Sequence, residues 1–372
     1  MQDKRQRALS APHACAACGG PVGRGLAENL WFHSGVPSIR YKMYWALAAA
    51  GVEAMVEHDC VKAPVTDVSD PEPGAVVPIV ARVSAALTAN ECGQVTVAWI
   101  MNGADATRAL AEAPTLAALE FELEHRWFTR LLDDGGLYMH FQPIVFVGRR
   151  EVAAYEALVR ATHDGRELSG GEIVATAQET GLLVPLDART RVRAIEQFAA
   201  HGLESQLFIN FQPSTIYSPR YCLRATFSVL ERTALRPENI VFEVIESEDV
   251  DDLAHLRRVM DMYRSHGLKV AMDDFGVGYS THQRLLRLRP DYIKLDRSLT
   301  VAVAYDAAAQ DHVASLVRLG AQEGCRVIAE GIETAAQHNI IRDLGIELAQ
   351  GYLYARPALQ PRVIWPEEGY NH

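Results

Sequence analysis

Two adjacent acids, Asp273 and Asp274, follow an apolar run and precede a turn rich in glycine in VAMDDFGVGYS (residues 270–280). Neighbouring carboxylates at the end of a buried strand are costly to desolvate unless cations or hydrogen-bond donors face them. Two chemistries fit this arrangement. One is the DFG of a protein kinase, in which the aspartate holds magnesium over ATP. The other is a different metal site, and the rest of the chain has to decide between them.

Polar groups also stand at or near the ends of the other apolar runs of this region. They are Glu156, Asn210, Glu243, Glu246, Lys294, Asp296, Glu330, Glu333 and Gln350. A carboxylate after a strand often does no more than cap the next helix. Capping does not account for seven successive strand ends, because apolar residues flank several of the acids on both sides. We therefore expect these groups to meet on one face of the fold.

The expected metal is Mg²⁺ or Mn²⁺, because the candidate ligands are hard oxygen atoms with no thiolate and little histidine among them. Four or five oxygen ligands with an adjacent aspartate pair suit two ions that share a bridging carboxylate. Two such ions can clamp the attacking and leaving oxygens of a phosphoryl displacement. The kinase interpretation fails because no HRD loop, APE or glycine-rich phosphate loop accompanies the DFG letters.

Eight short apolar runs alternate with helical stretches after the break DDGG at residues 133–136. The runs are LYMHFQPIVFV, VAAYEALVR, QLFINFQ, NIVFEVIES, LKVAMDDF, DYIKLD, CRVIAEGIE and LAQGYLY. Such alternation is typical of βα units and a parallel sheet. Eight runs over about 230 residues approach the ~250 residues of a (β/α)8 barrel, in which the carboxyl ends of the strands form the catalytic face. We predict an α/β protein with a TIM-like barrel.

A small α/β module is expected before the barrel, with a regulatory or sensor role. PSIRYKMYWALAAAG predicts a helix that ends at Gly51, and VEAMVEHDCVKAPV predicts one half-buried strand. A linker (residues 66–74), a second helix and a second strand follow. The predicted parts are an N-terminus at 1–28, the module at 29–113, the barrel at 114–362 and a tail at 363–372. A helix over residues 115–132 leads into the barrel, and we expect the module to act on the barrel through it.

Six cysteines are present, and only Cys15 and Cys18 have the spacing of metal ligands. A zinc ribbon needs a second such pair, which the sequence lacks. Histidines could complete a site in space. A zinc-knuckle-like N-terminus and a flexible one without Zn²⁺ both remain open.

The formal net charge of −11 argues against a nucleic acid polymer as partner, since polyanions are held by broad basic surfaces. No apolar run approaches the ~18 residues that cross a membrane. The N-terminus is basic, but no apolar signal core follows it. We expect a cytoplasmic protein without a membrane partner.

Eight ordered motifs resemble the EAL-domain phosphodiesterases, a family named for a tripeptide found here at Glu156–Leu158. They are FQPIV, EALVR, INFQPS, FEVIES, DDFGVGYS, IKLD, AEGIE and QGY, and the resemblance covers roughly residues 115–362. It implies a barrel that hydrolyses cyclic di-GMP to linear pGpG with Mg²⁺ or Mn²⁺ and so lowers this second messenger in bacterial signalling. It also implies a homodimer formed through the barrel.

The resemblance implies ligands for two metal ions. The first ion would be held by Glu156, Asn210, Glu243 and Asp273, and the second by Asp273 and Asp274. Lys294 would hold and polarise the attacking water. Glu330 would be the general base, and Gln350 would order Glu330 or a water on a metal.

The resemblance assigns further residues to the substrate and to a loop. Arg160 and Leu158 would contact the substrate phosphate and base, with Gln142 close by. Glu246 and Glu333 would pin the loop that follows Asp274, a loop that also supports dimer contacts in the family.

The sequence departs from the family pattern without losing a metal ligand. EALVRA replaces the commoner EALLRW, so an aromatic wall near the guanine is missing, and His282 and Gln283 replace small or apolar residues. Three alternatives stay open beside the enzyme. They are a non-catalytic cyclic di-GMP receptor, a scaffold whose N-terminal module binds a partner, and a different metallophosphodiesterase on the same barrel.

Overall fold

The computed structural model describes residues 28–65, 76–101, 105–203, 205–216, 223–245, 253–276 and 281–360, together with residues 363 and 365. Cys15, Cys18 and the linker at residues 66–74 lie outside the described residues, so the zinc hypothesis stays a prediction. The chain divides into two compact units, Met1–Phe128 and Thr129–His372. Each unit is described by itself.

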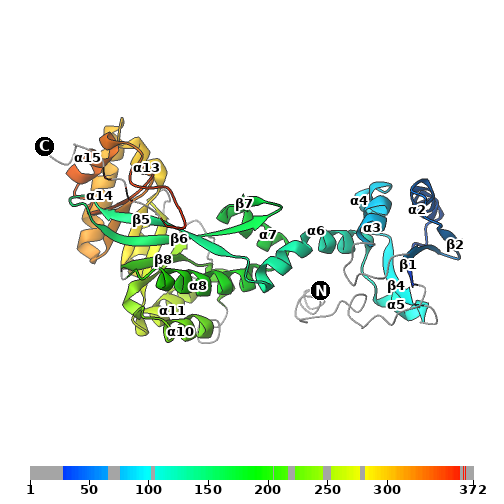
Figure 1. Ribbon diagram of the computed structural model, residues 1–372. Helices are drawn as coiled ribbons and strands as arrows, with labels where there is room; N and C mark the ends of the chain where they lie inside the picture. The colour runs from blue at the N-terminus through cyan, green and yellow to red at the C-terminus, as the bar shows by residue number, and fades with distance from the viewer. Residues whose placement is uncertain are drawn as a thin grey trace. The chain divides into compact units, whose positions relative to one another are not determined.

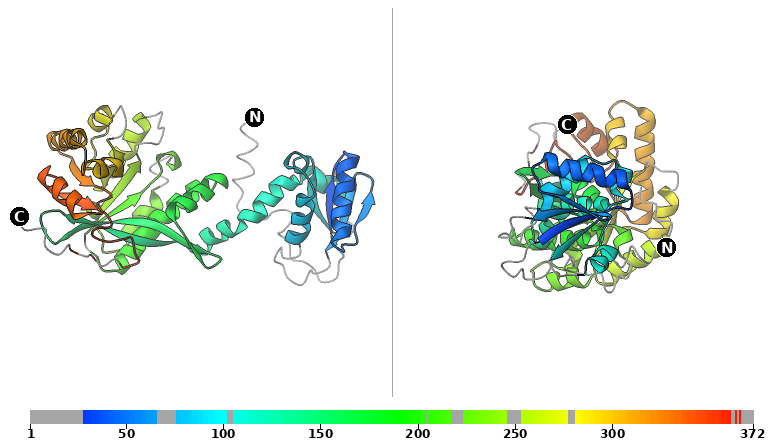
Figure 2. Two further views of the ribbon diagram at one scale, coloured as in Figure 1. Left: turned by 90° about the horizontal axis from the view of Figure 1, so that it is seen from above. Right: turned by 90° about the vertical axis from the view of Figure 1, so that its right-hand side faces the viewer.

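The first unit contains an antiparallel sheet with the strand order β2-β3-β1-β4. Its elements are β1 (Glu28–His33), α2 (Pro37–Ala49), β2 (Met55–Glu57), β3 (Cys60–Val65), α3 (Val76–Ala85), α4 (Ala89–Cys92), β4 (Thr96–Met101) and α5 (Ala106–Glu112). Helices α2 and α3 lie against the sheet (Figure 2) and share one core with it, since Met43 and Val80 are buried together with Phe32 and Val97. This unit confirms the expected small α/β module.

Two details of the module differ from the sequence-based expectation. The expected single strand in VEAMVEHDCVKAPV is a hairpin, because the chain reverses at His58, whose φ of 51° lies in the left-handed region. Strand β1 was not expected, yet it is central and pairs with both β3 and β4. Helix α2 agrees with the prediction, and the chain leaves it at Gly51 with a φ of 76°.

Helix α6 (Leu116–Asp133) confirms the helix expected over residues 115–132. Leu116 is buried in the core of the first unit, and Leu119 and Leu123 pack against that core. The first turns of α6 are therefore part of the first unit, which ends at Phe128.

The second unit is a closed barrel of eight strands, one for each predicted apolar run (Figure 1). The strands are β5 (Tyr138–Phe146), β6 (Val152–His163), β8 (Gln206–Asn210), β9 (Ile240–Ile245), β10 (Lys269–Phe275), β11 (Tyr292–Leu295), β12 (Arg326–Ala329) and β13 (Leu348–Gln350). A ninth strand, β7 (Arg166–Leu168), extends β6 as a hairpin. The pairing of β5 with β6 closes the ring.

Helices connect most of the barrel strands. They are α7 (Gly170–Glu179), α8 (Leu183–Ala200), α10 (Arg224–Leu230), α11 (Leu253–Ser265), α12 (Thr281–Leu288), α13 (Arg297–Ala302), α14 (Ala307–Glu323) and α15 (Ala335–Asp343), with the short 3-10 turns η2 (Pro213–Thr215) and η3 (Pro237–Asn239). Apolar side chains of these helices and of the outer strand faces form the larger core. Among the described residues, no helix combines the length and apolar character needed to cross a membrane.

Strand β5 is a correction to the expected all-parallel barrel. It runs antiparallel to both of its neighbours, β13 and β6. The reason is the connection from Phe146 to Val152, which holds too few residues for the crossover of a dozen or more that parallel strands need. The chain therefore turns back as a hairpin. The other seven barrel strands run parallel to one another, as predicted.

Candidate active site

A complete apolar layer crosses the barrel interior, with one buried side chain from each strand. It consists of Ile144, Ala154, Phe208, Val241, Ala271, Tyr292, Ile328 and Leu348. Side chains two residues apart on a strand point to the same face. The next layer toward the carboxyl ends of the parallel strands therefore also faces the interior.

That next layer is polar at every position. It consists of Gln142, Glu156, Asn210, Glu243, Asp273, Lys294, Glu330 and Gln350. Gln142 precedes its apolar partner in the chain, because β5 runs in the opposite direction. The structure thus brings together eight residues that the sequence singled out, and the apolar layer seals them from below.

Lys294 stands among four carboxylates. Its Nζ atom lies 2.7 Å from Glu330 Oε1, 3.0 Å from Glu243 Oε1, 3.2 Å from Glu156 Oε2 and 3.4 Å from Asp273 Oδ1. The lysine side chain is 1% exposed. A buried ammonium group is tolerated only when opposite charges surround it, and these four acids supply them.

Two amides orient the carboxylate of Glu156. Asn210 Nδ2 donates to its Oε1 over 2.9 Å, and Gln350 Nε2 donates to its Oε2 over 2.7 Å. Gln350 also donates to Gln142 Oε1 over 3.1 Å. Gly351 allows this placement, because a Cβ there would lie 2.0 Å from the main-chain oxygen of Ile332.

Asp274 reaches the same face as Asp273 through a bulge in β10. Adjacent strand residues normally point to opposite faces. Here Asp274 has a φ of 53°, its N–H donates to Asp273 Oδ1 over 3.0 Å, and the pairing with β11 shifts register between Met272 and Phe275. Oxygen atoms of Asp273, Asp274 and Glu330 then lie within 4.8 Å of one another. The bulge therefore allows both neighbouring acids to face one site.

Lys294 and Glu156 both favour their charged forms. Burial acts to lower the pKa of Lys294, but Asp273, Glu156 and the other acids raise it well above its usual value. Burial acts to raise the pKa of Glu156, but Lys294 and the hydrogen bonds from Gln350 and Asn210 hold it below its usual value.

Three further acids of the site, Glu243, Glu330 and Asp274, are shifted toward their protonated forms. Burial raises the pKa of Glu243 well above its usual range, against the opposing effect of Lys294. Burial raises the pKa of Glu330 to about 8, again against Lys294. Burial and then the charge of Asp273 raise the pKa of Asp274 to about 6. The site therefore holds more acid than its own ammonium group can neutralise.

Glu243 gives the clearest sign that a cation belongs here. Its side chain is 0% exposed, and both carboxyl oxygens lack a hydrogen-bond partner, although Lys294 Nζ lies 3.0 Å from one of them. Buried polar atoms left in this way need an explanation. Together with the Asp273, Asp274 and Glu330 cluster, they form an oxygen donor set that suits Mg²⁺ or Mn²⁺.

The remaining predicted residues are placed less centrally. Leu158 and Arg160 lie further along β6 with the same alternation as Glu156, and both are half-buried. Glu333 pairs with Arg297 Nη2 over 2.6 Å and is 41% exposed. Glu246 lies outside the described residues. Gln350 bonds to Glu156 and Gln142, so its assignment as a residue that orders Glu330 stays a prediction.

Comparison with known proteins identifies the family. The EAL domain model matches residues 125–357. The chain belongs to the EAL domain family. A bifunctional diguanylate cyclase/cyclic di-GMP phosphodiesterase, MucR from Pseudomonas aeruginosa, is 29% identical over 59% of this chain and 33% of its own length. The chain spans roughly a third of the length of the first curated relatives that it matches.

Two solved structures support the fold of this EAL protein. A standalone EAL protein from Vibrio cholerae in its c-di-GMP bound form is 35% identical, with a TM-score of 0.56 over 60% of this chain and 92% of that one. Klebsiella pneumoniae BlrP1 in a calcium/cy-diGMP complex is 21% identical, with a TM-score of 0.55 over 91% of this chain and 98% of that one. The second likeness concerns the fold alone.

Sequence reasoning missed a polar cluster beside the EAL motif. Tyr138, His140 and Arg160 meet at Glu167, which stands on β7. The Asp164–Gly165 turn was an available signal, because Asp-Gly between alternating residues predicts a tight hairpin. The hairpin brings Glu167 back to the face that carries Arg160.

Proposed function

We propose that this EAL protein is a metal-dependent phosphodiesterase that hydrolyses cyclic di-GMP to linear 5′-pGpG. The observation that carries the proposal is the unbroken polar layer, which together with Asp274 offers a competent side chain at every catalytic and metal-binding position expected of an active enzyme. The names of similar proteins, which include cyclic di-GMP phosphodiesterases, agree with it. The alternative is a receptor that binds the nucleotide without cleaving it.

Charge balance supports the requirement for divalent cations. Five carboxyl groups, Glu156, Glu243, Asp273, Asp274 and Glu330, face a single ammonium group. Uncompensated buried charge is strongly unfavourable, so ionising all five acids needs additional positive charge.

We assign the cation ligands from this donor set. One ion would be held by Glu156, Asn210, Glu243 and Asp273, and another by Asp273 and Asp274. When bound, these ions supply positive charge that stabilises the charge developing on the phosphate oxygens. Bound cations would also lower the pKa of the neighbouring acids, since they favour the charged carboxylates.

We assign the attacking water to Lys294 and Glu330. The ammonium group of Lys294 donates to the water oxygen, and the Glu330 carboxylate 2.7 Å away accepts the proton. The oxygen attacks phosphorus, the bond from phosphorus to the 3′ oxygen breaks, and that oxygen takes up a proton from solvent. The product keeps a 5′-phosphate. The main-chain oxygen of Glu330 accepts a hydrogen bond from Thr300, which fixes the start of the loop after β12.

The substrate would enter from above the polar layer. Gln142 is buried beside Gln350, and Leu158 and Arg160 continue the same face of β6 beyond Glu156. A guanidinium group is well suited to a phosphate, and a half-buried leucine side chain offers an apolar surface to a base.

The test is incubation of the full chain with cyclic di-GMP and Mg²⁺ or Mn²⁺, followed by chromatographic separation of the nucleotides. We expect linear pGpG as the first product. If calorimetry detects binding but no product forms over many hours, the protein is a receptor for the nucleotide and not a hydrolase. A different nucleotide as the only substrate would keep the reaction type and overturn the substrate assignment.

A further inference from the structure

The β5–β6 pair continues beyond the polar layer and forms one wall above the site. Gln142 pairs with Glu156, His140 with Leu158, and Tyr138 with Arg160. Because positions two apart share a face, His140, Tyr138, Leu158 and Arg160 lie on the face that carries Glu156. Figure 1 shows these two long strands and the short β7 beside them.

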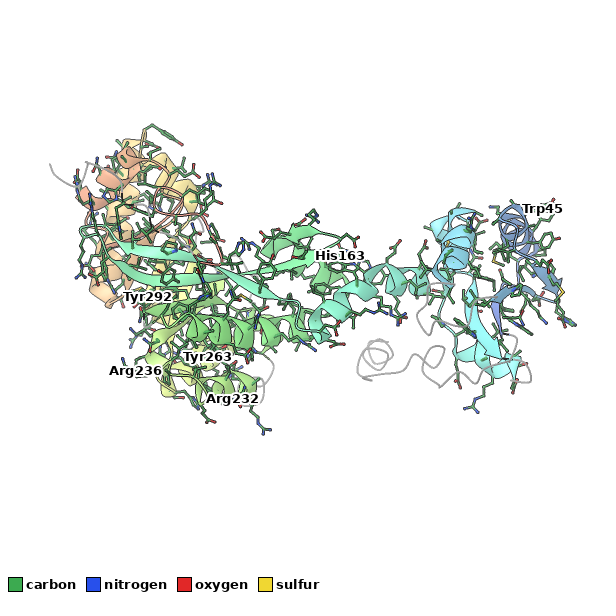
Figure 3. The ribbon with its side chains drawn as sticks, in the orientation of Figure 1. Trp45, His163, Arg232, Arg236, Tyr263 and Tyr292 are labelled. Carbon is green, nitrogen blue, oxygen red and sulfur yellow. The ribbon has the colours of Figure 1, made fainter. Side chains whose placement is uncertain are left out.

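The β6–β7 hairpin returns an acid to this same wall. Its two-residue turn, Asp164–Gly165, has φ values of 50° and 75°, as a tight hairpin requires. The register pairs His163 with Arg166 and Thr162 with Glu167. His163 is labelled near the outer end of the hairpin in Figure 3. Thr162 stands two residues beyond Arg160 and so lies on the same face of the strand. Its partner Glu167 therefore faces the approach to the site rather than its outer side.

Three groups converge on the Glu167 carboxylate. The Tyr138 hydroxyl donates to its Oε2 over 2.8 Å, and His140 Nε2 lies 3.4 Å from the same oxygen. Arg160 Nε lies 3.8 Å from Oε1, while Arg160 Nη1 donates to the main-chain oxygen of Val159 over 2.8 Å. His140 and Arg160 are each 16% exposed, and Glu167 is 48% exposed.

We propose that Glu167 competes with a substrate phosphate for Arg160 and so weakens substrate binding. The inference rests on the proposed function, in which Arg160 meets a phosphate. A phosphodiester is an anion, and an anion that approaches Arg160 also approaches the carboxylate that already faces it. Like charges brought together at a binding site oppose binding, so the phosphate must displace Glu167 or share the arginine with it.

The geometry favours competition over support. A carboxylate that braces an arginine for phosphate binding would leave its terminal nitrogens directed at the ligand. Here one of the two terminal nitrogens, Nη1, is turned onto the chain's own Val159 carbonyl, and Nε faces Glu167. Glu167 is also half-exposed on a hairpin strand of three residues, so it can move aside at small cost.

The test is Glu167→Gln in the full chain, with KM and kcat measured for cyclic di-GMP in Mn²⁺ and the Kd measured by calorimetry in Ca²⁺. Glutamine keeps the shape and can still accept from Tyr138, but it removes the charge. We expect KM and Kd to fall by about three- to tenfold with kcat unchanged. The gain should shrink at high salt and disappear in an Arg160→Ala background.

Glu151→Gln is the matched control, because it removes one negative charge at the other end of the β5–β6 hairpin, where Glu151 pairs with Arg149. It should leave KM and Kd unchanged. If the unaltered protein turns over cyclic di-GMP but KM is unchanged or higher in Glu167→Gln, the inference about Glu167 is wrong and the proposed hydrolase function stands. Tighter binding by Glu167→Gln without turnover in either protein supports the inference and overturns the hydrolase. Absence of both binding and turnover in both proteins overturns both.

Discussion

The ammonium nitrogen of Lys294 lies 2.7 Å from the carboxylate of Glu330, although the two residues come from neighbouring strands 36 positions apart. Each stands two residues beyond a member of the apolar layer, Tyr292 and Ile328, so the alternation of β11 and β12 fixes both directions. In the proposed mechanism Glu330 accepts the proton of the attacking water, and the ammonium group of Lys294 lies beside it. Its members can be separated experimentally.

Glu330→Gln should lose turnover and keep substrate binding. The amide preserves shape but cannot accept the proton, so we expect kcat to fall by about 10²–10⁴-fold with Kd changed little. Product chromatography and calorimetry measure the two quantities. Glu323→Gln, at the exposed end of α14, is the control and should behave like the unaltered protein. A normal kcat in Glu330→Gln would remove Glu330 as the general base.

Lys294→Met should destabilise the barrel most strongly in chelator. Removing the ammonium leaves four facing carboxylates without a buried cation, and breaking such a set costs about 3–5 kcal/mol. Mn²⁺ should restore more stability to this variant than to the unaltered protein, as measured by thermal unfolding. Lys269→Met is the control. It removes a lysine whose Nζ atom lies 5.8 Å from the centre of the Tyr292 ring, in place of the lysine that faces the four carboxylates. Equal unfolding temperatures in chelator would contradict the charge argument.

Activity should vanish in chelator and return with Mg²⁺ or Mn²⁺, because the donor set of Asp273, Asp274 and Glu330 consists of oxygen atoms. Ca²⁺ should bind and inhibit, since it is larger and accepts looser geometry that does not hold water in line. Both Mn²⁺ and Ca²⁺ should raise the unfolding temperature, which reports binding independently of turnover. Full activity after exhaustive chelation would refute the metal requirement.

Much of the barrel could be predicted from sequence, because each strand carries a polar residue two positions from an apolar one that faces the barrel interior. The offset is physical: Phe208 and Asn210, or Val241 and Glu243, share a face because a strand repeats every two residues. Any barrel whose interior is filled by one apolar layer, and whose next layer carries the functional side chains, must show this two-residue spacing.

Other features depended on strand pairing that the apolar runs alone do not reveal. The antiparallel direction of β5 follows from the short link before Val152, a constraint that apolar runs alone do not show. The convergence of Asp274 with Asp273 requires the bulge, and Glu167 meets Arg160 only through hairpin register. Strand β1 was missed because ENLWFH is short, and pairing on both sides rather than local propensity makes it a strand.

Cys325 should resist alkylation in the folded protein. Burial raises the pKa of its thiol to about 12, so the reactive thiolate is scarce at pH 8.5, whereas an unfolded cysteine ionises near pH 9. The same shift means that ionisation of the unfolded chain opposes folding progressively as pH rises from about 9 to 12. Iodoacetamide labelling with peptide mass spectrometry, with and without urea, measures the difference. Equal labelling in both conditions would show that the thiol is accessible.

A buried ion pair on α8 was also missed by sequence reasoning. Asp187 and Arg191 stand one turn apart on α8, and both are buried, at 6% and 2% exposure. Asp187 also accepts from the Gln212 N–H over 3.2 Å and from Thr215 Oγ1 over 2.8 Å. It therefore ties α8 to the turn that follows Asn210, a polar-layer residue.

Arg191→Met should destabilise the second unit by about 3–5 kcal/mol, because it leaves the Asp187 carboxylate buried without its cation. The double variant Asp187→Asn/Arg191→Met should recover part of the loss, since the stranded charge is then gone. Arg189→Met is the matched control on the same helix. Arg189 makes an exposed pair with Asp133 over 2.7 Å, and such surface pairs contribute about 0–1 kcal/mol. Urea unfolding followed by circular dichroism ranks the variants, and a loss in Arg191→Met no larger than in Arg189→Met would show that the buried pair does not hold α8 to this turn.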